Sequence, residues 1–373
     1  MIKTLSLFHG VGGLTSTSKL LDIRAVSEYE ENIFLTADYA YHQKTGERLN
    51  NLGDITKITP EDIDLLGDID LLIATPPCQA YSVGGKRASR EDPRGLLWQY
   101  AINIIEQIKP KVIIVENVKN ILAIEEGEVL RWYLESLSSL GYSVDFDIIN
   151  SASYGLTQER ERFFMMGIRN DIWGEVNEKL TSNSTANQKR TTEELAKNKP
   201  HSTSSILDEL EAYSREKEKL RRGLENAPQQ ETKKESLPGD LIEGNQEIQE
   251  PLLHNSKDSK ALVAFSKSHR DHHIDLRCHL NTKVNTLTTG RGCNHQSTGN
   301  YLLKKGKFYE ISPEQAERLM GWPISMTAQR FSSKDSFEVI ENSDSLRYKM
   351  SGNGVCGGIL DSYLDNLIKL DIL

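Results

Sequence analysis

Cysteine is scarce in this chain, with four among 373 residues, and no two of them stand in C-x-x-C spacing. A disulfide scaffold and a zinc ribbon are therefore not indicated, and we expect reduced thiols. Long hydrophobic runs are also missing, since none approaches the roughly 20 apolar residues of a membrane span. Residues 1–8 lead into His9 and Gly10 rather than into a signal-peptide core and its cleavage site. We therefore expect a cytoplasmic protein with no membrane partner.

The chain has no excess of basic residues, because its net charge is −9 and its isoelectric point is near 5.6. This balance argues mildly against a general polyanion binder, since phosphate contacts are made by Lys and Arg. A local basic cluster does stand at Lys86, Arg87, Arg90 and Arg94. It could place positive potential beside a neighbouring site or be an ordinary solvated loop, and the cluster alone leaves both readings open.

The length and the 37% hydrophobic content are enough for a large core and predict two domains. Between residues 4 and 169, short apolar runs alternate with amphipathic stretches, which predicts the α/β class with a mostly parallel sheet covered by helices. Strands are expected at 4–8, 23–28, 71–74, 112–116, 142–149 and 163–168. Helices are expected at 97–107, 129–140, 313–320 and 358–370.

Residues 171–251 have a different composition, dominated by Ser, Thr, Asn, Gln, Lys and Glu, with Trp173 and Tyr213 as their only aromatic residues. Such a segment cannot build much core. One charged helix is expected over 206–224, with flexible flanks. We interpret this segment as a partly disordered insert, and globular character returns near Ala261.

A cysteine follows two prolines in Pro76-Pro77-Cys78-Gln79, just after the apolar run 71–74. Proline fixes its own φ and restricts the residue before it, so the Cys78 thiol would leave the strand end in one defined direction. This arrangement is typical of a rigidly held nucleophile. An ordinary Pro-Pro turn followed by a small buried residue is the alternative.

Glycines follow the first expected strand in Phe8-His9-Gly10-Val11-Gly12-Gly13, and we expect a helix after them. Glycine allows a tight turn and a close approach of backbone to ligand, while an acidic residue at the next strand end can bind ribose hydroxyls. Glu28 occupies that position, Tyr29 offers an aromatic face for a purine, and Asp54 adds a carboxylate for an adenine amino group. The pattern indicates a nucleoside cofactor.

Two further polar groups lie at ends of expected strands. Glu116 follows the apolar run 112–115, and a carboxylate at the end of a buried strand indicates a charged partner or a catalytic role. A helix cap or an ion pair with a lysine is the alternative explanation. In Gln158-Glu159-Arg160-Glu161-Arg162, alternate side chains of an extended segment would share a face. That second pattern is also consistent with a surface ion-pair ladder.

Taken together, these motifs closely resemble the DNA cytosine-C5 methyltransferase family, in the family's own order. Its recognition-domain helix resembles residues 312–323, and its last motif resembles Ser351-Gly352-Asn353-Gly354-Val355. The resemblance spans residues 1–170 and 285–373. It implies a Rossmann-like class I S-adenosylmethionine-dependent methyltransferase domain with a smaller target-recognition domain. The implied division is a catalytic and cofactor domain at 1–170, the insert at 171–255, recognition at 256–311, and C-terminal helices returning to the catalytic domain at 312–373.

The resemblance implies that a Cys78 thiolate adds to cytosine C6, which makes C5 nucleophilic toward the methyl group of S-adenosylmethionine. Since these atoms are unreachable inside a duplex, the base would be flipped out, with residues 80–94 as a lid. The implied catalytic residues are Cys78, Glu116, Arg160 and Arg162. The implied cofactor residues are Phe8, Gly10, Gly12, Gly13, Glu28, Tyr29, Asp54, Pro76, Asn353 and Val355. The implied DNA-binding residues are Ser82, Gly84, Lys86, Arg87, Gln158, Thr286, Arg291, Asn294, His295 and Gln296.

The expected partner is duplex DNA, with a cognate restriction endonuclease as a further candidate, and we expect a monomer. The family branch that methylates transfer RNA is the alternative substrate class, and a catalytically silent DNA-binding scaffold is the alternative outside enzymes. Residues 269–295 are rich in histidine and include cysteines, which are the usual ligands of a zinc site. No pair of them has structural-zinc spacing on both sides, so we expect no metal.

Overall fold

The computed structural model describes residues 1–13, 15, 18–77, 97–154, 156, 158–175, 284–285, 301–304, 307–310 and 312–373. Within these ranges, no helix is long and apolar enough to cross a membrane.

The central feature is a six-stranded sheet with the strand order β2-β1-β3-β4-β7-β5. Strands β1 (Ile2–Leu7), β2 (Leu21–Ser27), β3 (Leu71–Ala74) and β4 (Val112–Val118) pair in parallel. Strand β7 (Glu161–Arg169) is antiparallel to both β4 and β5 (Tyr142–Asn150). All six expected strands are therefore present. The antiparallel pairing is possible because β5 returns into β7 through the short 3-10 turn η4 (Ser151–Tyr154) rather than through a crossover helix.

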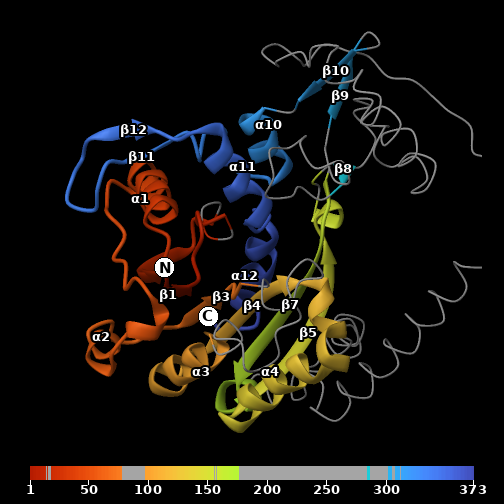
Figure 1. Cartoon of the computed structure of the whole chain (residues 1–373). Coiled ribbons are helices and arrows are strands. Elements are labelled where there is room, and N and C mark those ends of the chain that lie inside the picture. The colour runs from red at the N-terminus through yellow and green to blue at the C-terminus, as the bar shows by residue number, and fades with distance from the viewer. Residues whose placement is uncertain are drawn as a thin grey trace, which may run out of the picture.

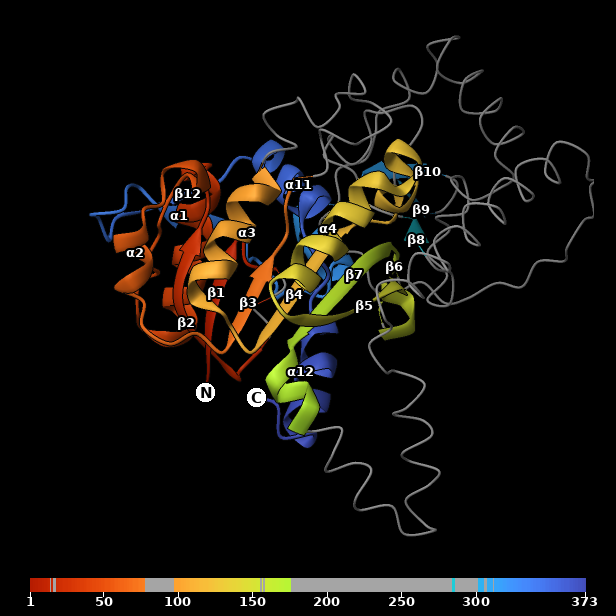
Figure 2. The same cartoon turned by 90° about the horizontal axis from the view of Figure 1, so that it is seen from below.

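Helices cover both faces of the sheet, because side chains of successive strand residues point to opposite faces. On β3, Leu72 and Ala74 join the core formed with α3 (Leu97–Ile108) and α4 (Glu128–Ser139). Leu71 and Ile73 join a second core that includes α12 (Ile359–Lys369). Figures 1 and 2 show α3 and α4 on one side of the sheet and α12 on the other. The predicted sheet covered by helices is confirmed.

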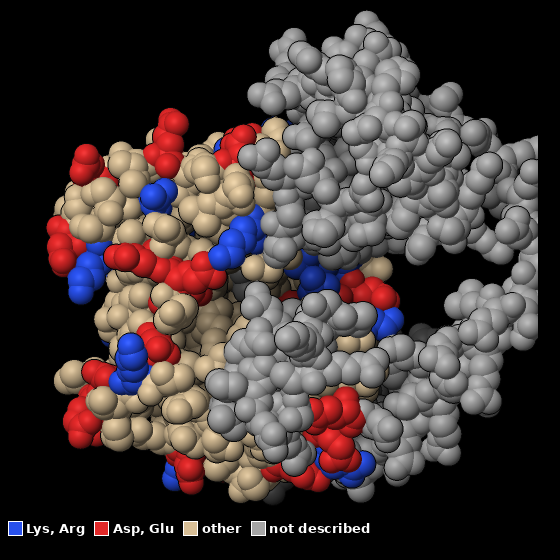
Figure 3. All heavy atoms as spheres, in the orientation of Figure 1, with Lys and Arg blue, Asp and Glu red and all other residues tan. Residues whose placement is uncertain are grey.

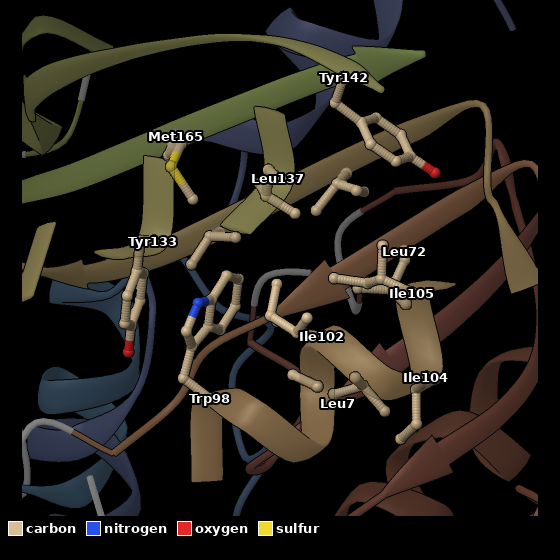
Figure 4. Close-up of a cluster of buried hydrophobic side chains, with 14 of the residues drawn as sticks. Leu7, Leu72, Trp98, Ile102, Ile104, Ile105, Tyr133, Leu137, Tyr142 and Met165 are labelled. Atoms are coloured by element: carbon tan, nitrogen blue, oxygen red, sulfur yellow. The ribbon is translucent and has the colours of Figure 1, made fainter. Parts of the chain in front are cut away.

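The core under α3 and α4 is closely packed around two aromatic rings (Figure 4). The indole of Trp98 stacks on the ring of Tyr133 with centroids 4.1 Å apart. Both side chains are about 1% exposed. A fully buried aromatic or aliphatic side chain contributes roughly 1.5–3 kcal/mol. This core therefore holds the sheet rigidly enough for the ends of its strands to carry a site.

Helix α1 (Glu31–Thr45) was not predicted from the sequence. Its buried residues are consecutive from Ile33 to Asp38, so no single apolar stripe marks it. The reason is that strand β11 (Gln329–Phe331) of a C-terminal hairpin also packs on the helix, where Phe331 joins Phe34 and Leu35 in one apolar cluster. The helix ends at Gly46, whose φ of 80° permits the left-handed cap.

The C-terminal part consists of α10 (Pro313–Leu319), the hairpin of β11 and β12 (Val339–Glu341), α11 (Asp344–Asn353) and α12, which packs on the sheet. Shorter elements are η1 (Ile55–Lys57), α2 (Pro60–Asp64) and η3 (Lys119–Gly127). Of the expected recognition domain, the structure describes β8 (Val284–Asn285), which pairs with β6 (Gln158–Glu159), and the hairpin of β9 (Tyr301–Lys304) and β10 (Lys307–Glu310). The helix expected over 206–224 lies outside the described residues.

The segment that joins β1 to β2 differs from expectation, since it holds no helix among its described residues 8–13, 15 and 18–20. Phe8, Gly10 and Gly12 have φ angles of 56°, 62° and 76°. Left-handed residues at this spacing form turns within the glycine loop itself.

Candidate functional site

The glycine loop after β1 is tied to the end of β2 by a carboxylate. The backbone N–H of Gly10 donates to Oε2 of Glu28 at 2.7 Å, and the N–H of Glu30 donates to Oε1 at 2.8 Å. Burial raises the pKa of the Glu28 carboxyl, although these two N–H groups act in the opposite direction. The loop and the end of β2 are therefore joined by a direct hydrogen bond.

Asn51 holds the next segment beside Glu28, and sequence reasoning missed it. Its Oδ1 accepts from the N–H of Glu28 at 3.1 Å and from the N–H of Gly53 at 3.0 Å, while its Nδ2 donates to the carbonyl of Glu28. This brings Asp54 to the same edge of the sheet, where its Oδ1 accepts from the N–H of Thr56. The sequence feature that could have identified Asn51 is its side-chain amide, two residues before Gly53-Asp54. Tyr29 is 76% exposed and therefore available for stacking.

His9 lies inside the glycine loop and is buried. Its Nδ1 is 2.9 Å from the hydroxyl of Ser6, and burial lowers the pKa of the imidazole to about 4. A methyl group added at Gly12 would come within 2.8 Å of the His9 Nε2. The neutral ring thus fills the inner side of the loop, and glycine at position 12 leaves room for it.

The strand end that leads to Cys78 is anchored on both sides. The hydroxyl of Thr75 donates to the carbonyl of Phe8 at 2.7 Å, and Nδ2 of Asn117 donates to the carbonyl of Pro76 at 3.3 Å. Strand β3 lies between β1 and β4 (Figure 1), so these bonds hold it to its two neighbours. Cys78 itself lies outside the described residues.

Glu116 is 7% exposed at the end of β4, and its Oε1 lies 3.3 Å from Nε of Arg162 on β7. The register explains the contact, because Val118 is opposite Arg162 and Glu116 is two residues away on the same face. Burial raises the pKa of the Glu116 carboxyl, against the opposing effect of Arg162 and Arg160. The pair combines a carboxyl whose pKa is raised by burial with a fixed positive charge.

The three residues expected to share one face divide into two roles, because the extended segment is interrupted at Arg160 between β6 and β7. Arg160 is 2% exposed, and its Nη2 donates to the carbonyls of Gly352 at 2.9 Å and Gly354 at 2.7 Å. Gln158 is fully buried and donates toward the carbonyl of Leu319 at 3.5 Å. The predicted DNA contact of Gln158 stays a prediction.

The C-terminal motif lies against this arginine. Asn353 is the exposed last residue of α11, and Val355 is buried with its carbonyl accepting from Nε1 of Trp322 at 2.8 Å. The structure thus brings together the loop after β1, the ends of β2, β3 and β4, and residues 351–355 of the C-terminal part. The cofactor and catalytic roles of these residues stay predictions.

Several predicted residues lie outside the described residues, and so do the histidines and cysteines of the stretch 269–295. They are the lid and recognition residues Ser82, Gly84, Lys86, Arg87, Thr286, Arg291, Asn294, His295 and Gln296. On the face drawn in Figure 3, acidic and basic side chains are interspersed over the described surface, in keeping with the net charge of −9.

Comparison with known proteins matches residues 2–369 to the family described as C-5 cytosine-specific DNA methylase. The type II methyltransferase M.HhaI of Haemophilus parahaemolyticus is 27% identical over 98% of this chain and 94% of that protein. The type II methyltransferase M.NgoBI of Neisseria gonorrhoeae is 36% identical over 46% of this chain, and the chain spans about half of that relative, 52%. The fold is shared with the Dnmt2 methyltransferase of S. pombe, with a TM-score of 0.59 and 16% identity over 99% of this chain and 98% of the other. The chain therefore belongs to the C-5 cytosine-specific DNA methylase family.

Proposed function

We propose that this chain transfers a methyl group from S-adenosylmethionine to C5 of cytosine in duplex DNA. The observation that carries the proposal is the buried Glu116 carboxyl, with its raised pKa and its ion pair to Arg162. It stands at the end of β4, beside the strand that continues into Pro76-Pro77-Cys78. A proton donor, a fixed cation and a thiol are the groups that cytosine C5 chemistry requires.

The reaction begins when the Cys78 thiolate forms a bond to C6 of the base. The electron pair of the C5–C6 double bond moves into the ring, and Glu116 shares its proton with N3, so that the charge on the ring is neutralised. Arg162 would hold the O2 oxygen. Once C5 carries the methyl group, a base takes the C5 proton, the C5–C6 double bond re-forms as the thiolate leaves C6, and the N3 proton returns to Glu116. Cys78 is thus regenerated and is never the methyl acceptor.

The residues at the strand ends fit S-adenosylmethionine, the cofactor on which the family depends. Nothing lies within 4 Å of where a side chain would begin at Gly10, so there is open space in front of the loop. Glu28 and the exposed ring of Tyr29 border it in sequence and structure. When bound there, the cofactor would supply an electrophilic methyl group. Phe8, Gly12, Asp54, Pro76 and Asn353 are the other residues that we expect to hold it, with Gly13 and Val355.

Bisulfite sequencing of plasmid DNA from a methylation-deficient host that expresses the chain tests this proposal. We expect methylated cytosines at one sequence context and none with the Cys78→Ser variant, which should still bind S-adenosylmethionine. Unmethylated plasmid under confirmed expression would contradict the proposal. Parallel assays on duplex DNA and transfer RNA separate the two substrate classes, and methylation of transfer RNA alone would favour the alternative. Retained activity of Cys78→Ser would refute the covalent mechanism.

A further inference from the structure

The indole of Trp322 lies between two glycines that belong to different parts of the chain. A methyl group built at Gly13 would come within 2.5–2.6 Å of three indole atoms, and one built at Gly354 would overlap the same ring. Trp322 is 4% exposed, and its Nε1 donates to the carbonyl of Val355 at 2.8 Å. One side chain thus contacts the glycine loop after β1 and the C-terminal motif together.

At Gly13 the need for glycine comes from the indole, whereas at Gly354 an added methyl group would meet the indole and also the carbonyl oxygen of Met350 at 2.9 Å. Gly10 and Gly12 have left-handed φ angles, but Gly13 does not, and Gly354 has a φ of −73°. Any L residue could adopt the backbone conformation at Gly354. The two glycines and the tryptophan therefore form a fitted unit, in which the ring occupies the volume that two side chains would need.

The ring is held in place from the end of helix α10. The N–H of Trp322 donates to the carbonyl of Glu317 at 3.0 Å, and the N–H of Gly357 donates to the carbonyl of Met320 at 2.8 Å. The Glu317 carboxylate in turn accepts from Nη2 of Arg347 at 2.9 Å and from the N–H of Ser325 at 2.6 Å. The position of the indole is thus fixed by the segment that follows the expected recognition domain.

We propose that Trp322 is a positioning residue for cofactor binding, because it sets the separation between residues 10–13 and residues 353–355. It does not itself reach the reacting atoms. The assignment rests on the proposed function for the identity of the cofactor. If this role is correct, the segment that follows the expected recognition domain controls the shape of the cofactor site through the indole of Trp322.

A double-mutant cycle tests the fit. Gly13→Ala should raise the Kd for S-adenosylmethionine by about tenfold, which corresponds to about 1.4 kcal/mol. In the Trp322→Leu background the same alanine meets no indole, so its effect should shrink to less than about twofold. Gly174→Ala is the matched control, since Gly174 is a described glycine with no positive φ and nothing within 4 Å of the added methyl group. It should leave the Kd unchanged.

Isothermal titration calorimetry gives the Kd values, and thermal unfolding shows whether each variant is folded. If Trp322→Leu does not fold, Trp322→Phe serves in its place, because it lacks the indole atoms that meet Gly13. In steady-state assays, Trp322→Phe should raise the KM for S-adenosylmethionine, while kcat and the KM for DNA stay within about twofold. A purely structural role would instead lower thermal stability with no change in cofactor Kd.

Two outcomes would overturn the proposal, and they are distinguishable. If wild-type protein binds S-adenosylmethionine but the effects of Gly13→Ala and the Trp322 variant are additive, the assignment of Trp322 alone is wrong. If wild-type protein does not bind S-adenosylmethionine, the proposed function is wrong, and the positioning role of Trp322 is wrong with it.

Discussion

Arg160→Met should destabilise the protein strongly, because Arg160 holds two backbone carbonyls of the C-terminal motif. The methionine keeps the apolar stem but removes the donor to Gly352 and Gly354, at 2.9 and 2.7 Å. Leaving a buried polar group unsatisfied costs about 1–3 kcal/mol. One of these bonds is fully buried and the other partly so, and we therefore expect a loss of about 2–5 kcal/mol in the free energy of unfolding.

Equilibrium unfolding in urea measures this loss as a lower midpoint with an unchanged slope. Arg162→Met is the matched comparison, since it removes the same group from the neighbouring strand. Arg162 faces the Glu116 carboxyl, whose raised pKa lets it become protonated when the cation is lost. We expect Arg162→Met to abolish methylation with a stability loss of less than about 1.5 kcal/mol.

The reasoning is refuted if Arg160→Met unfolds within about 0.5 kcal/mol of wild type, the range of ordinary surface substitutions. Loss of activity at unchanged stability would mean that Arg160 acts on the substrate rather than on residues 352–354. The reverse ranking of the two variants, with Arg162→Met the less stable, would also contradict the structure.

Three further predictions follow from buried polar groups. Burial lowers the pKa of folded His9 from the ordinary value of 6.5 to about 4. When the pH falls from 6.5 to 4, the unfolded chain therefore binds a proton on His9 and the folded chain does not, which favours unfolding. Urea unfolding should show up to about 3 kcal/mol lost over that window, and His9→Asn should flatten the profile. Glu317→Gln removes a fully buried charge facing Arg347, which keeps its ion pair with Glu314, so the loss should be about 1–3 kcal/mol by the same measurement. An unchanged midpoint would mean that the Glu317–Arg347 pair is not buried in solution. Glu28→Gln loses one of two backbone contacts and should weaken S-adenosylmethionine binding about tenfold by calorimetry. An unaltered Kd would exclude Glu28 from the cofactor site.

Local sequence patterns were enough to predict most of the sheet. Strand β3 was predicted with its observed bounds, Leu71–Ala74, because an apolar run of this length followed by two prolines is too short for a helix. Helix α1 was missed, since its burial depends on the C-terminal hairpin that packs on it from nearly 300 residues away, as shown by the hydrogen bond of Tyr39 to Gln329. The helix expected after the glycine loop is not present among the described residues 15 and 18–20.

By itself, the sequence determined the order of motifs and the kind of chemistry they favour, because residue type and strand-end position are local properties. Only the tertiary structure separated Arg162, which faces Glu116, from Arg160, which binds residues 352–354. It also placed Trp322 between Gly13 and Gly354. These contacts join segments that are distant in the chain, and their geometry depends on strand register and core packing. No pattern within a single segment contains that information.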